Sequence, residues 1–293
     1  MNAIPESCPS YRIKPKKKTI NRVTNVASVP QLSPFRYPGG KTWLVPEIRL
    51  WLNKLGFRPN IFIEPFAGGG IASLTAIMEN KADKVILCEL DHQVAAVWQT
   101  ILKDADWLVD KILSFDINLN NVRELLSREF TNYKDIAFQT LVKNRTQRGG
   151  IMAPGASLMN SGENGKGVTS RWYPDTIAKR IKKIHEYRER IEFIQGDGMQ
   201  IIEHYRDDER VVFFVDPPYT AGRKSAGKRL YVHNEIDHER LFDLMSKISG
   251  KFLMTYDNTP EVLNMAKKFG FYNEQVLMKN THNQEKYELL ITK

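Results

Sequence analysis

The sequence predicts an α/β protein built on a mostly parallel sheet. From residue 61 onward, short apolar runs of strand length alternate with segments of helical periodicity, which is the pattern of successive βαβ units. Several of these runs end in a glycine turn or an acidic residue, and open α/β sheets hold their ligands at such strand ends. The last two runs follow one another directly, so we expect a mixed sheet with one antiparallel strand.

The composition is typical of a globular protein with one large domain and a smaller insert. Of the 293 residues, 42% are hydrophobic and 26% are charged. The 43 Lys and Arg exceed the 34 Asp and Glu, and the net charge of +9 favours a polyanionic partner such as nucleic acid. Two cysteines cannot form a disulfide framework, and the six histidines lack metal-ligand spacing. We therefore expect a cytoplasmic protein with no metal and no membrane span.

Residues 1–33 are predicted to form a flexible basic tail. They contain four prolines and no hydrophobic period, and their charge is concentrated in Lys14, Lys16, Lys17 and Lys18. A segment of this kind is usually solvated and mobile. It can also serve as a basic arm that contacts phosphates, and the two interpretations are compatible.

The regular elements follow from periodicity and from the residues that flank each run. The first half is predicted to contain a helix at 42–55, a strand at 61–63, a helix to 78, a strand at 85–88, a helix at 92–102 and mainly helices across 104–143. The second half is predicted to contain strands at 191–195, 211–215 and 251–255, helices at 238–248 and 261–269, and closing strands near 272–278 and 286–292.

Residues 144–173 interrupt this alternation. They contain six glycines with Asn and Ser between them, and they show little periodicity. A loop of this length inside a compact domain is usually functional or disordered. We therefore divide the structured chain into a sheet domain, residues 34–103 and 190–293, and an insert, residues 104–189, that is mostly helix and loop.

The glycine turn from Gly68 to Gly70 is the first candidate for ligand binding. Glycine allows close backbone approach and positive φ, and the helix that follows presents free N–H groups. The spacing fits neither the dinucleotide fingerprint nor the P-loop, and a glycine turn alone also serves packing. Glu89 ends the next predicted strand, about 20 residues further on, where an acid can accept hydrogen bonds from ribose hydroxyls. Together they favour a nucleoside-type ligand.

Asp216-Pro217-Pro218-Tyr219 is a more specific motif. The apolar strand at 211–215 delivers it to the carboxyl edge of the sheet. Proline has a fixed φ and no N–H, so the Pro217 carbonyl is an oriented acceptor beside the Asp216 carboxylate. Such a pair can hold both hydrogens of a planar amine such as adenine N6, and Tyr219 can stack on the base. The alternative is a proline turn with an acidic cap.

Three motifs together resemble a known family. They are Phe35-Arg36-Tyr37-Pro38-Gly39-Gly40-Lys41, Glu64-Pro65-Phe66-Ala67-Gly68-Gly69-Gly70 and Asp216-Pro217-Pro218-Tyr219. Their order resembles the Dam-type, or class alpha, family of DNA adenine N6-methyltransferases over about residues 34–293. The resemblance implies a Rossmann-like S-adenosylmethionine-dependent methyltransferase sheet, with the insert serving target recognition.

The resemblance also implies roles for matching residues. The target adenine would be bound by Asp216, Pro217, Pro218 and Tyr219. S-adenosyl-L-methionine would be bound by Tyr37, Lys41, Phe66, Gly68, Gly70, Glu89, Asp197 and Asp216. The family often has Trp-Ala before Gly-Gly-Lys, where this chain has Tyr-Pro, and often Asp in place of Glu89. Candidate DNA contacts are Asn144, Arg145, Gln147, Arg148, Lys166 and Arg171, and the alternative is a solvated loop with ordinary charges.

The implied reaction is direct methyl transfer to N6 of an adenine that has left the duplex. Hydrogen bonds to Asp216 and to the Pro217 carbonyl would draw N6 towards tetrahedral geometry, and positioning would supply most of the rate. Cys8 and Cys88 are poorly placed for the covalent thiolate route of cytosine C5 methylation. The alternatives are methylation of cytosine N4, RNA adenine or protein glutamine, and a DNA-binding relative without activity.

The expected partner is double-stranded DNA. If the enzyme belongs to a restriction-modification system, a restriction endonuclease that cuts the same site is a further expected partner. The alternatives are an orphan methyltransferase and a phage methyltransferase. We expect a monomer.

Overall fold

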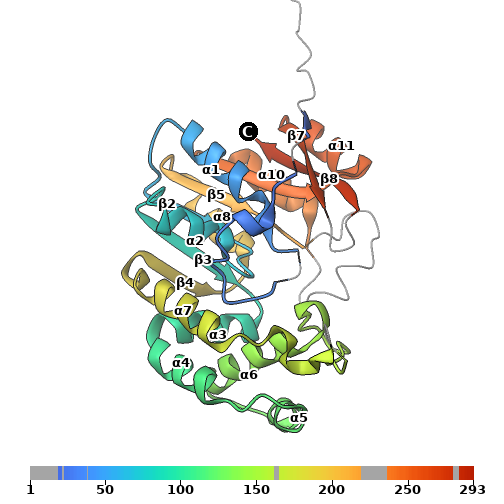
Figure 1. Ribbon diagram of the computed structural model, residues 1–293. Coiled ribbons are helices and arrows are strands. Elements are labelled where there is room, and N and C mark those ends of the chain that lie inside the picture. Colours follow the sequence, from blue (N-terminus) through green and yellow to red (C-terminus); the bar gives the residue numbers. More distant parts are fainter. Residues whose placement is uncertain (1–18, 22, 38, 162–164, 219–235, 280–283) are drawn as a thin grey trace, which may run out of the picture.

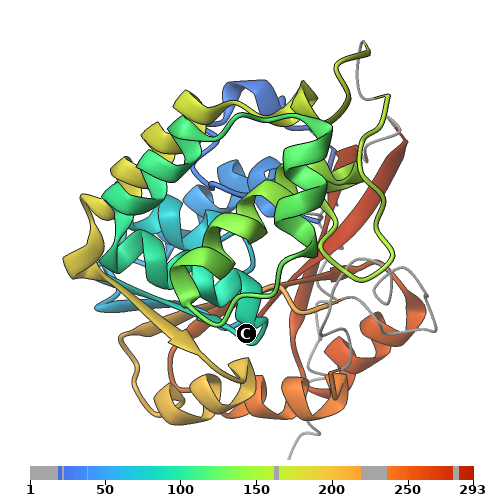
Figure 2. The ribbon, with the colours of Figure 1, turned by 90° about the horizontal axis from the view of Figure 1, so that it is seen from below.

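An eight-stranded sheet with helices on both faces forms the body of the molecule (Figures 1 and 2). The computed structural model describes residues 19–21, 23–37, 39–161, 165–218, 236–279 and 284–293. The strands are β1 (Thr19–Ile20), β2 (Ile61–Glu64), β3 (Lys84–Glu89), β4 (Ile191–Gln195), β5 (Val211–Val215), β6 (Lys251–Asp257), β7 (Tyr272–Lys279) and β8 (Glu285–Thr292).

Helices are present in each range where the periodicity predicted them, and the helices Pro174–His185 and Gly198–Tyr205 are additional ones for which no range was predicted. The α-helices are α1 (Val45–Lys54), α2 (Ile71–Met78), α3 (His92–Lys103), α4 (Ala105–Ser114), α5 (Leu119–Ser127), α6 (Tyr133–Thr146), α7 (Pro174–His185), α8 (Gly198–Tyr205), α10 (His238–Lys247) and α11 (Pro260–Lys268). The 3-10 helices are η1 (Val26–Ser28), η2 (Lys41–Leu44), η3 (Arg148–Gly150), η5 (Gly167–Arg171) and η6 (Arg188–Arg190).

The strand order is β1-β7-β8-β6-β5-β2-β3-β4. Strand β8 is antiparallel to both β6 and β7, and every other pair is parallel. The prediction of a mixed sheet with one antiparallel strand is confirmed. The central parallel strands place their carboxyl ends at one edge, and that edge receives the glycine turn, Glu89 and Asp216.

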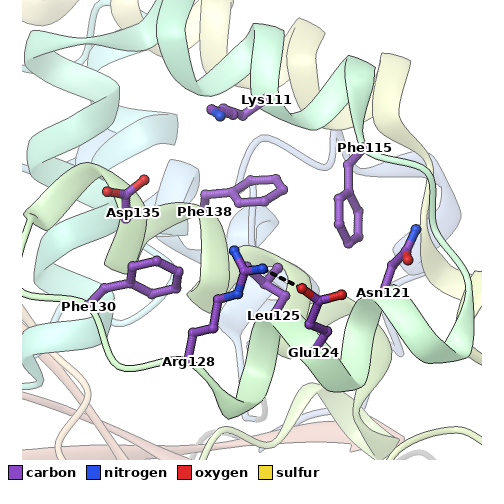
Figure 3. Close-up of a pocket in the computed structure, with 9 residues that line it drawn as sticks. All are labelled: Lys111, Phe115, Asn121, Glu124, Leu125, Arg128, Phe130, Asp135 and Phe138. Atoms are coloured by element: carbon purple, nitrogen blue, oxygen red, sulfur yellow. Dashed lines mark hydrogen bonds and ion pairs between the residues drawn. The ribbon is translucent and has the colours of Figure 1, made fainter.

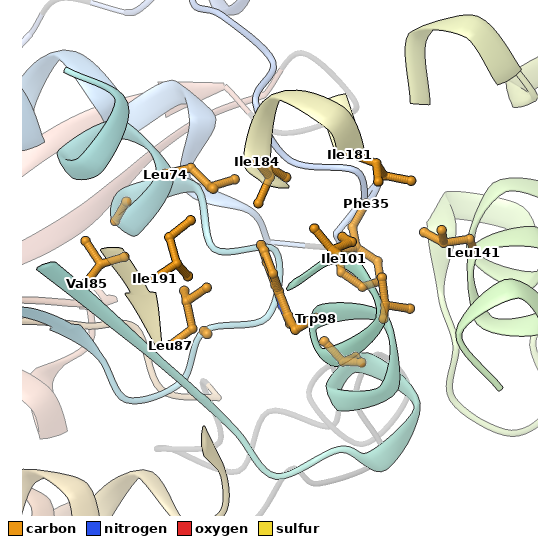
Figure 4. Close-up of a cluster of buried hydrophobic side chains, with 14 of the residues drawn as sticks. Phe35, Leu74, Val85, Leu87, Trp98, Ile101, Leu141, Ile181, Ile184 and Ile191 are labelled. Atoms are coloured by element: carbon orange, nitrogen blue, oxygen red, sulfur yellow. The ribbon is translucent and has the colours of Figure 1, made fainter. Parts of the chain in front are cut away.

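Each face of the sheet is covered by its own apolar core. Strand β5 is buried at every position, as expected for a central strand covered on both faces. Alternate residues of β5 separate: Val212 and Phe214 pack with α1, α2 and α3, whereas Phe213 and Val215 pack with α8, α10 and α11. Trp98 of α3 is fully buried in the first core, among the residues drawn in Figure 4.

The insert shares the first of these cores. Apolar residues of α4, α6 and α7, among them Leu108, Leu141 and Ile181, are continuous with the cluster that contains Phe62 and Val85 of the sheet. In Figure 1 these helices lie below the sheet, against α3. The boundary predicted at residue 104 therefore separates the sheet from the helical insert along the chain, but the hydrophobic core continues across it.

The long glycine-rich segment is partly regular. Helix α6 extends through Thr146, an isolated antiparallel bridge joins Gln147 to Leu158, and η5 precedes α7. The prediction of an irregular region across 144–173 was therefore too broad, since the first three of its residues complete a helix.

The second half of the predicted tail is part of the fold, which corrects the boundary at residue 33. Strand β1 pairs in parallel with β7, with Thr19 opposite Gln275. Val29 is 5% exposed and packs with Val45 and Ile71. The predicted basic cluster, Lys14 to Lys18, lies outside the described residues.

Candidate active site

The glycine turn after β2 is closed by two aromatic side chains. A Cβ atom at Gly68, where φ is +46°, would lie 2.6 Å from the Tyr37 ring. At Gly70, where φ is +65°, it would lie 2.7 Å from the Trp98 ring. The Trp98 indole N–H also donates to the Gly68 carbonyl, at 3.0 Å. These contacts and the positive φ values require glycine, and they place Tyr37 of the first motif directly against the second.

Glu64, at the end of β2, holds the start of the next helix. Its carboxylate accepts a hydrogen bond from the Ser73 backbone N–H at 2.9 Å, one of the free N–H groups in the first turn of α2. The pKa of Glu64 is raised from an ordinary value of 4.5 to about 8, chiefly because the side chain is buried. The Asp216 carboxylate makes a smaller contribution to this rise, and the hydrogen bonds from Ser73 oppose it.

Glu89 ends β3 beside the glycine turn. Its Oε2 accepts from the Gly68 N–H at 2.9 Å, and its Oε1 accepts from the N–H groups of Leu90 and Asp91. Burial raises the pKa of Glu89, and the backbone donors oppose that rise. The carboxylate is thus fixed in direction at the strand end predicted for a ribose-binding acid.

Asp197 and Phe66 lie on the next part of the same edge. Asp197 follows β4 and caps α8 by accepting from the Met199 N–H at 2.9 Å. Gly198 is required there, because a Cβ atom would lie 2.3 Å from the Pro65 carbonyl oxygen and 3.0 Å from the Phe66 ring. The ends of β2, β3 and β4 therefore lie together at one edge of the sheet.

The hydrogen-bonding groups at this edge fit S-adenosylmethionine. A nucleoside needs acceptors for its hydroxyl and amino groups, and Glu89 and Asp197 supply two fixed carboxylates on adjacent strands. The turn from Gly68 to Gly70 brings the backbone to the same place without side chains. The group would be held by this turn and these acids, with Tyr37 and Phe66 as the neighbouring aromatic surfaces.

Asp216 lies at the end of β5 within a buried polar cluster. Its Oδ1 is 2.9 Å from the Lys41 ammonium and accepts from the Thr255 hydroxyl at 2.7 Å. Lys41 is 3% exposed, and its ammonium is also 3.7 Å from Glu288. The structure therefore places Lys41, which was predicted to bind the cofactor, against the Asp216 carboxylate. Pro217 is buried and Pro218 is half-buried, whereas Tyr219 lies outside the described residues.

Three of the predicted DNA contacts are buried, and the prediction is wrong for their side chains. Asn144 is fully buried, Arg145 is 4% exposed and Gln147 is 8% exposed. Asn144 accepts from the Arg36 N–H at 2.8 Å and donates to the carbonyls of Arg36 and Gly150, at 3.1 and 2.8 Å. These bonds fix the segment that carries Tyr37, so Asn144 supports the cofactor side from within the insert.

Arg145 has a similar internal role. Its guanidinium donates to the Pro34 carbonyl, and Gln147 donates to the Ala156 carbonyl at 3.4 Å. Burial, together with the neighbouring charges of Arg180 and Arg36, lowers the pKa of Arg145 to about 9. By contrast, Arg148 and Lys166 are exposed and Arg171 is half-buried, and a contact of these three residues with DNA stays a prediction.

A separate hollow lies within the insert (Figure 3). It has a volume of about 270 Å³ and lies between α4, α5 and α6. Phe115 and Phe138 meet edge to face across it, and Arg128 is paired with Glu124. None of the predicted site residues lines it, so it is no part of the edge described above.

Sequence reasoning missed Trp98, Thr255 and Glu288. Trp98 is one of many apolar residues in a predicted helix, and nothing in the sequence indicates that its N–H reaches Gly68. Thr255 ends a predicted strand beside the one that leads to Asp216, and this adjacency was the available signal. Within the described ranges no three potential metal ligands lie together, and none of the helices there has the length and apolarity to span a membrane.

The sheet order and the acids at its carboxyl edge define a Rossmann-like methyltransferase that uses S-adenosylmethionine. The chain belongs to the family described as D12 class N6 adenine-specific DNA methyltransferase, whose sequence model matches residues 37–280. It is therefore an enzyme that transfers a methyl group from S-adenosylmethionine to N6 of adenine in DNA.

A curated relative and two solved structures are similar to the chain. The type II methyltransferase M.MjaIII of Methanocaldococcus jannaschii is 25% identical over 239 residues, covering 74% of this chain and 81% of the relative. PH1948 of Pyrococcus horikoshii is 11% identical, with a TM-score of 0.42, over 91% of this chain and 90% of that one. The B. subtilis tRNA methyltransferase TrmK is 10% identical, with a TM-score of 0.35, over 84% and 64%. These structural likenesses are too distant to bear on the substrate.

Proposed function

We propose that the carboxyl edge of the sheet methylates one adenine within a specific sequence of double-stranded DNA, after that adenine has left the duplex. The observation that carries this proposal is the position of Asp216. It ends β5, which neighbours β2, so the acid that would bind the amine lies next to the glycine turn that would bind the cofactor. Methyl transfer needs these two ligands in line and in contact.

The residues of the edge divide into a cofactor side and a base side. S-adenosylmethionine supplies the electrophilic sulfonium methyl. The cofactor side comprises Tyr37, Phe66, Gly68, Gly70, Glu89 and Asp197, with Lys41 and Asp216 at the boundary. The base side comprises Asp216, Pro217, Pro218 and Tyr219.

The base side acts on the geometry of the amine. The N6 lone pair of adenine is delocalised into the ring and is a weak nucleophile. Asp216 and the Pro217 carbonyl accept the two N6 hydrogens, which draws the nitrogen towards tetrahedral geometry and directs its lone pair at the methyl group. Tyr219 replaces the stacking that the base loses on leaving the duplex.

The insert provides the contacts to DNA. Arg148 and Lys166 are exposed on the insert and Arg171 is half-buried there, and guanidinium and ammonium groups can bind phosphates or base edges. Because Asn144 bonds the Arg36 backbone, DNA held by the insert is held in register with the catalytic edge.

The chain acts as a monomer on its own DNA site. The name of the M. jannaschii relative, a type II methyltransferase, supports the further hypothesis that a restriction endonuclease for the same sequence accompanies it.

The test is methylation of unmethylated genomic DNA with isotopically labelled S-adenosylmethionine, followed by digestion to nucleosides and mass analysis. The proposal expects label in N6-methyladenine, at one recurring sequence. Label in N4-methylcytosine, or in RNA or protein alone, would overturn it.

A further inference from the structure

Four polar side chains from separate segments meet at the start of the Asp-Pro-Pro turn. They are Lys41, Asp216, Thr255 and Glu288. We infer that Thr255 and Glu288 are positioning residues for methyl transfer: Thr255 fixes the Asp216 carboxylate directly, and Glu288 fixes it through Lys41. This inference rests on the proposed function, since it assigns residues that serve Asp216.

The sheet brings the three strand residues to one place. Phe214, Leu253 and Leu290 belong to the core on one face of the sheet. Side chains two positions apart along a strand lie on the same face. Asp216 lies two positions after Phe214, and Thr255 lies two positions after Leu253. Glu288 lies two positions before Leu290 on the antiparallel strand, so all three side chains are on the same face.

The pairing of the strands sets these residues side by side. Thr255 of β6 is opposite Leu290 of β8, and Glu288 is opposite Asp257. Met254 of β6 is opposite Val215 of β5, so Thr255 and Asp216 are the next residues along these two parallel strands. Helix η2 begins at Lys41 and delivers its ammonium to the same face.

Two contacts to the Asp216 carboxylate fall on the same oxygen. The Thr255 hydroxyl donates to Asp216 Oδ1 at 2.7 Å, and the Lys41 ammonium is 2.9 Å from that atom. Two donors on one oxygen fix the rotation of the carboxylate about its Cβ–Cγ bond, and so they fix the direction of Oδ2. A fixed acceptor direction is what alignment of the N6 amine requires.

Burial strengthens the electrostatic part of this arrangement. Thr255 is fully buried, and Glu288 is 8% exposed, so their interactions are weakly screened. The Asp216 carboxylate complements the cationic sulfonium and the positive charge that passes to N6 during transfer. Glu288 balances the Lys41 ammonium, which would otherwise repel the sulfonium.

The decisive comparison is between Thr255→Val and Thr255→Ser. Valine keeps the shape and removes the hydroxyl, whereas serine keeps the hydroxyl. The measurement is the single-turnover rate of methyl transfer from preformed enzyme–cofactor–DNA complexes, with the affinity for S-adenosylmethionine measured separately. Thr100→Val is the matched control, because Thr100 is equally buried but bonds the Ala96 carbonyl within α3.

We expect Thr255→Val to lower the single-turnover rate about tenfold or more, as for loss of a hydrogen bond to a charged group. Cofactor affinity should change less than threefold, and Thr255→Ser should recover most of the rate. Glu288→Gln should also lower the rate, because the Lys41 ammonium loses the second carboxylate that lies beside it. Thr100→Val should match the wild type.

Two results would overturn the inference alone while the proposed function stands. One is an active wild-type enzyme with an unchanged rate in Thr255→Val. The other is a Thr255→Ser rate as low as that of valine, which would indicate packing instead of the hydroxyl. A wild-type protein that binds S-adenosylmethionine but transfers no methyl group to DNA would overturn the proposed function, and this inference with it.

Discussion

The carboxyl edge of the sheet and the surface of the insert use charge in opposite ways. At the edge, each acid is held by the protein itself: Glu64 by Ser73, Glu89 by Gly68, and Asp216 by Lys41 and Thr255. On the insert, no ion pair or side-chain hydrogen bond within the described residues holds Arg148 or Lys166. The first arrangement suits fixed chemistry, and the second suits a ligand that supplies its own counter-charges.

Polar side chains in the buried part of the insert are also held by bonds within the protein, as the acids at the edge are. Asn144 and Arg145 bond the backbone of residues 34–36, which precede Tyr37. The insert thus has an internal layer that bonds the segment before Tyr37 and an external layer that includes the exposed Arg148 and Lys166. Variants in the two layers should fail in different ways.

The largest effect is expected at Asp216. Asp216→Ala removes the acceptor for N6 and should lower methyl transfer by at least about 10²-fold, while cofactor affinity changes only severalfold. Asp243→Asn is the control, because Asp243 is a half-buried acid on α10 that is paired with Lys247. Transfer by Asp216→Ala within a few fold of the wild type would remove Asp216 from the reaction.

Glu64→Gln tests the buried edge by its pH dependence. Glu64 has a folded-state pKa of about 8 and an ordinary value of 4.5, so the folded protein binds the extra proton between these values. Stability should therefore fall as pH rises through this range, by on the order of several kcal/mol. Glutamine can still accept from the Ser73 N–H but does not titrate. Denaturant unfolding at pH 5 and pH 9 should show a flatter dependence in the variant, and equal slopes would contradict the assignment.

Asn144→Ala tests the internal layer of the insert. The change leaves the Arg36 N–H and two carbonyls without their buried partner, and it should cost about 2 kcal/mol in the free energy of unfolding. It should also weaken cofactor binding, because Tyr37 follows Arg36. Asn53→Ala, which removes only an exposed contact with Lys81, is the control. A loss of DNA binding with unchanged stability would return Asn144 to the DNA surface.

Arg148→Gln tests the external layer and should have the smallest effect. DNA affinity should fall severalfold, and the salt dependence of binding should lose about one phosphate contact if the guanidinium binds the backbone. Cofactor affinity and stability should be unchanged. Arg240→Gln changes an exposed side chain of α10 and should leave DNA binding intact. Equal losses in both variants would indicate a general effect of net charge.

Much of the sheet was predictable because its signals are local. Apolar runs such as 211–215 and turns such as Gly68 to Gly70 identify themselves by sequence, and so the order of strands and acids along the chain followed. The position of β8 was predicted only in part: the sequence indicated one antiparallel strand, but not that it lies between β6 and β7.

The insert and the N-terminal segment were less predictable, because burial there depends on distant partners. Arg145 looks like a DNA contact by residue type, and only the fold shows that it meets the Pro34 carbonyl. Thr19 and Ile20 have no periodicity of their own and form a strand because β7 offers a free edge. Thr255 and Glu288 reach Asp216 only through strand order and register.

The most direct test of the division between edge and insert is to map methylated sites on unmethylated DNA treated with the wild-type enzyme, Arg148→Gln and Asp216→Ala. The account predicts N6-methyladenine at one recurring sequence for the wild type, a weaker or less selective pattern of the same modified base for Arg148→Gln, and almost none for Asp216→Ala. Methylation at another atom, or abundant methylation by Asp216→Ala, would contradict it.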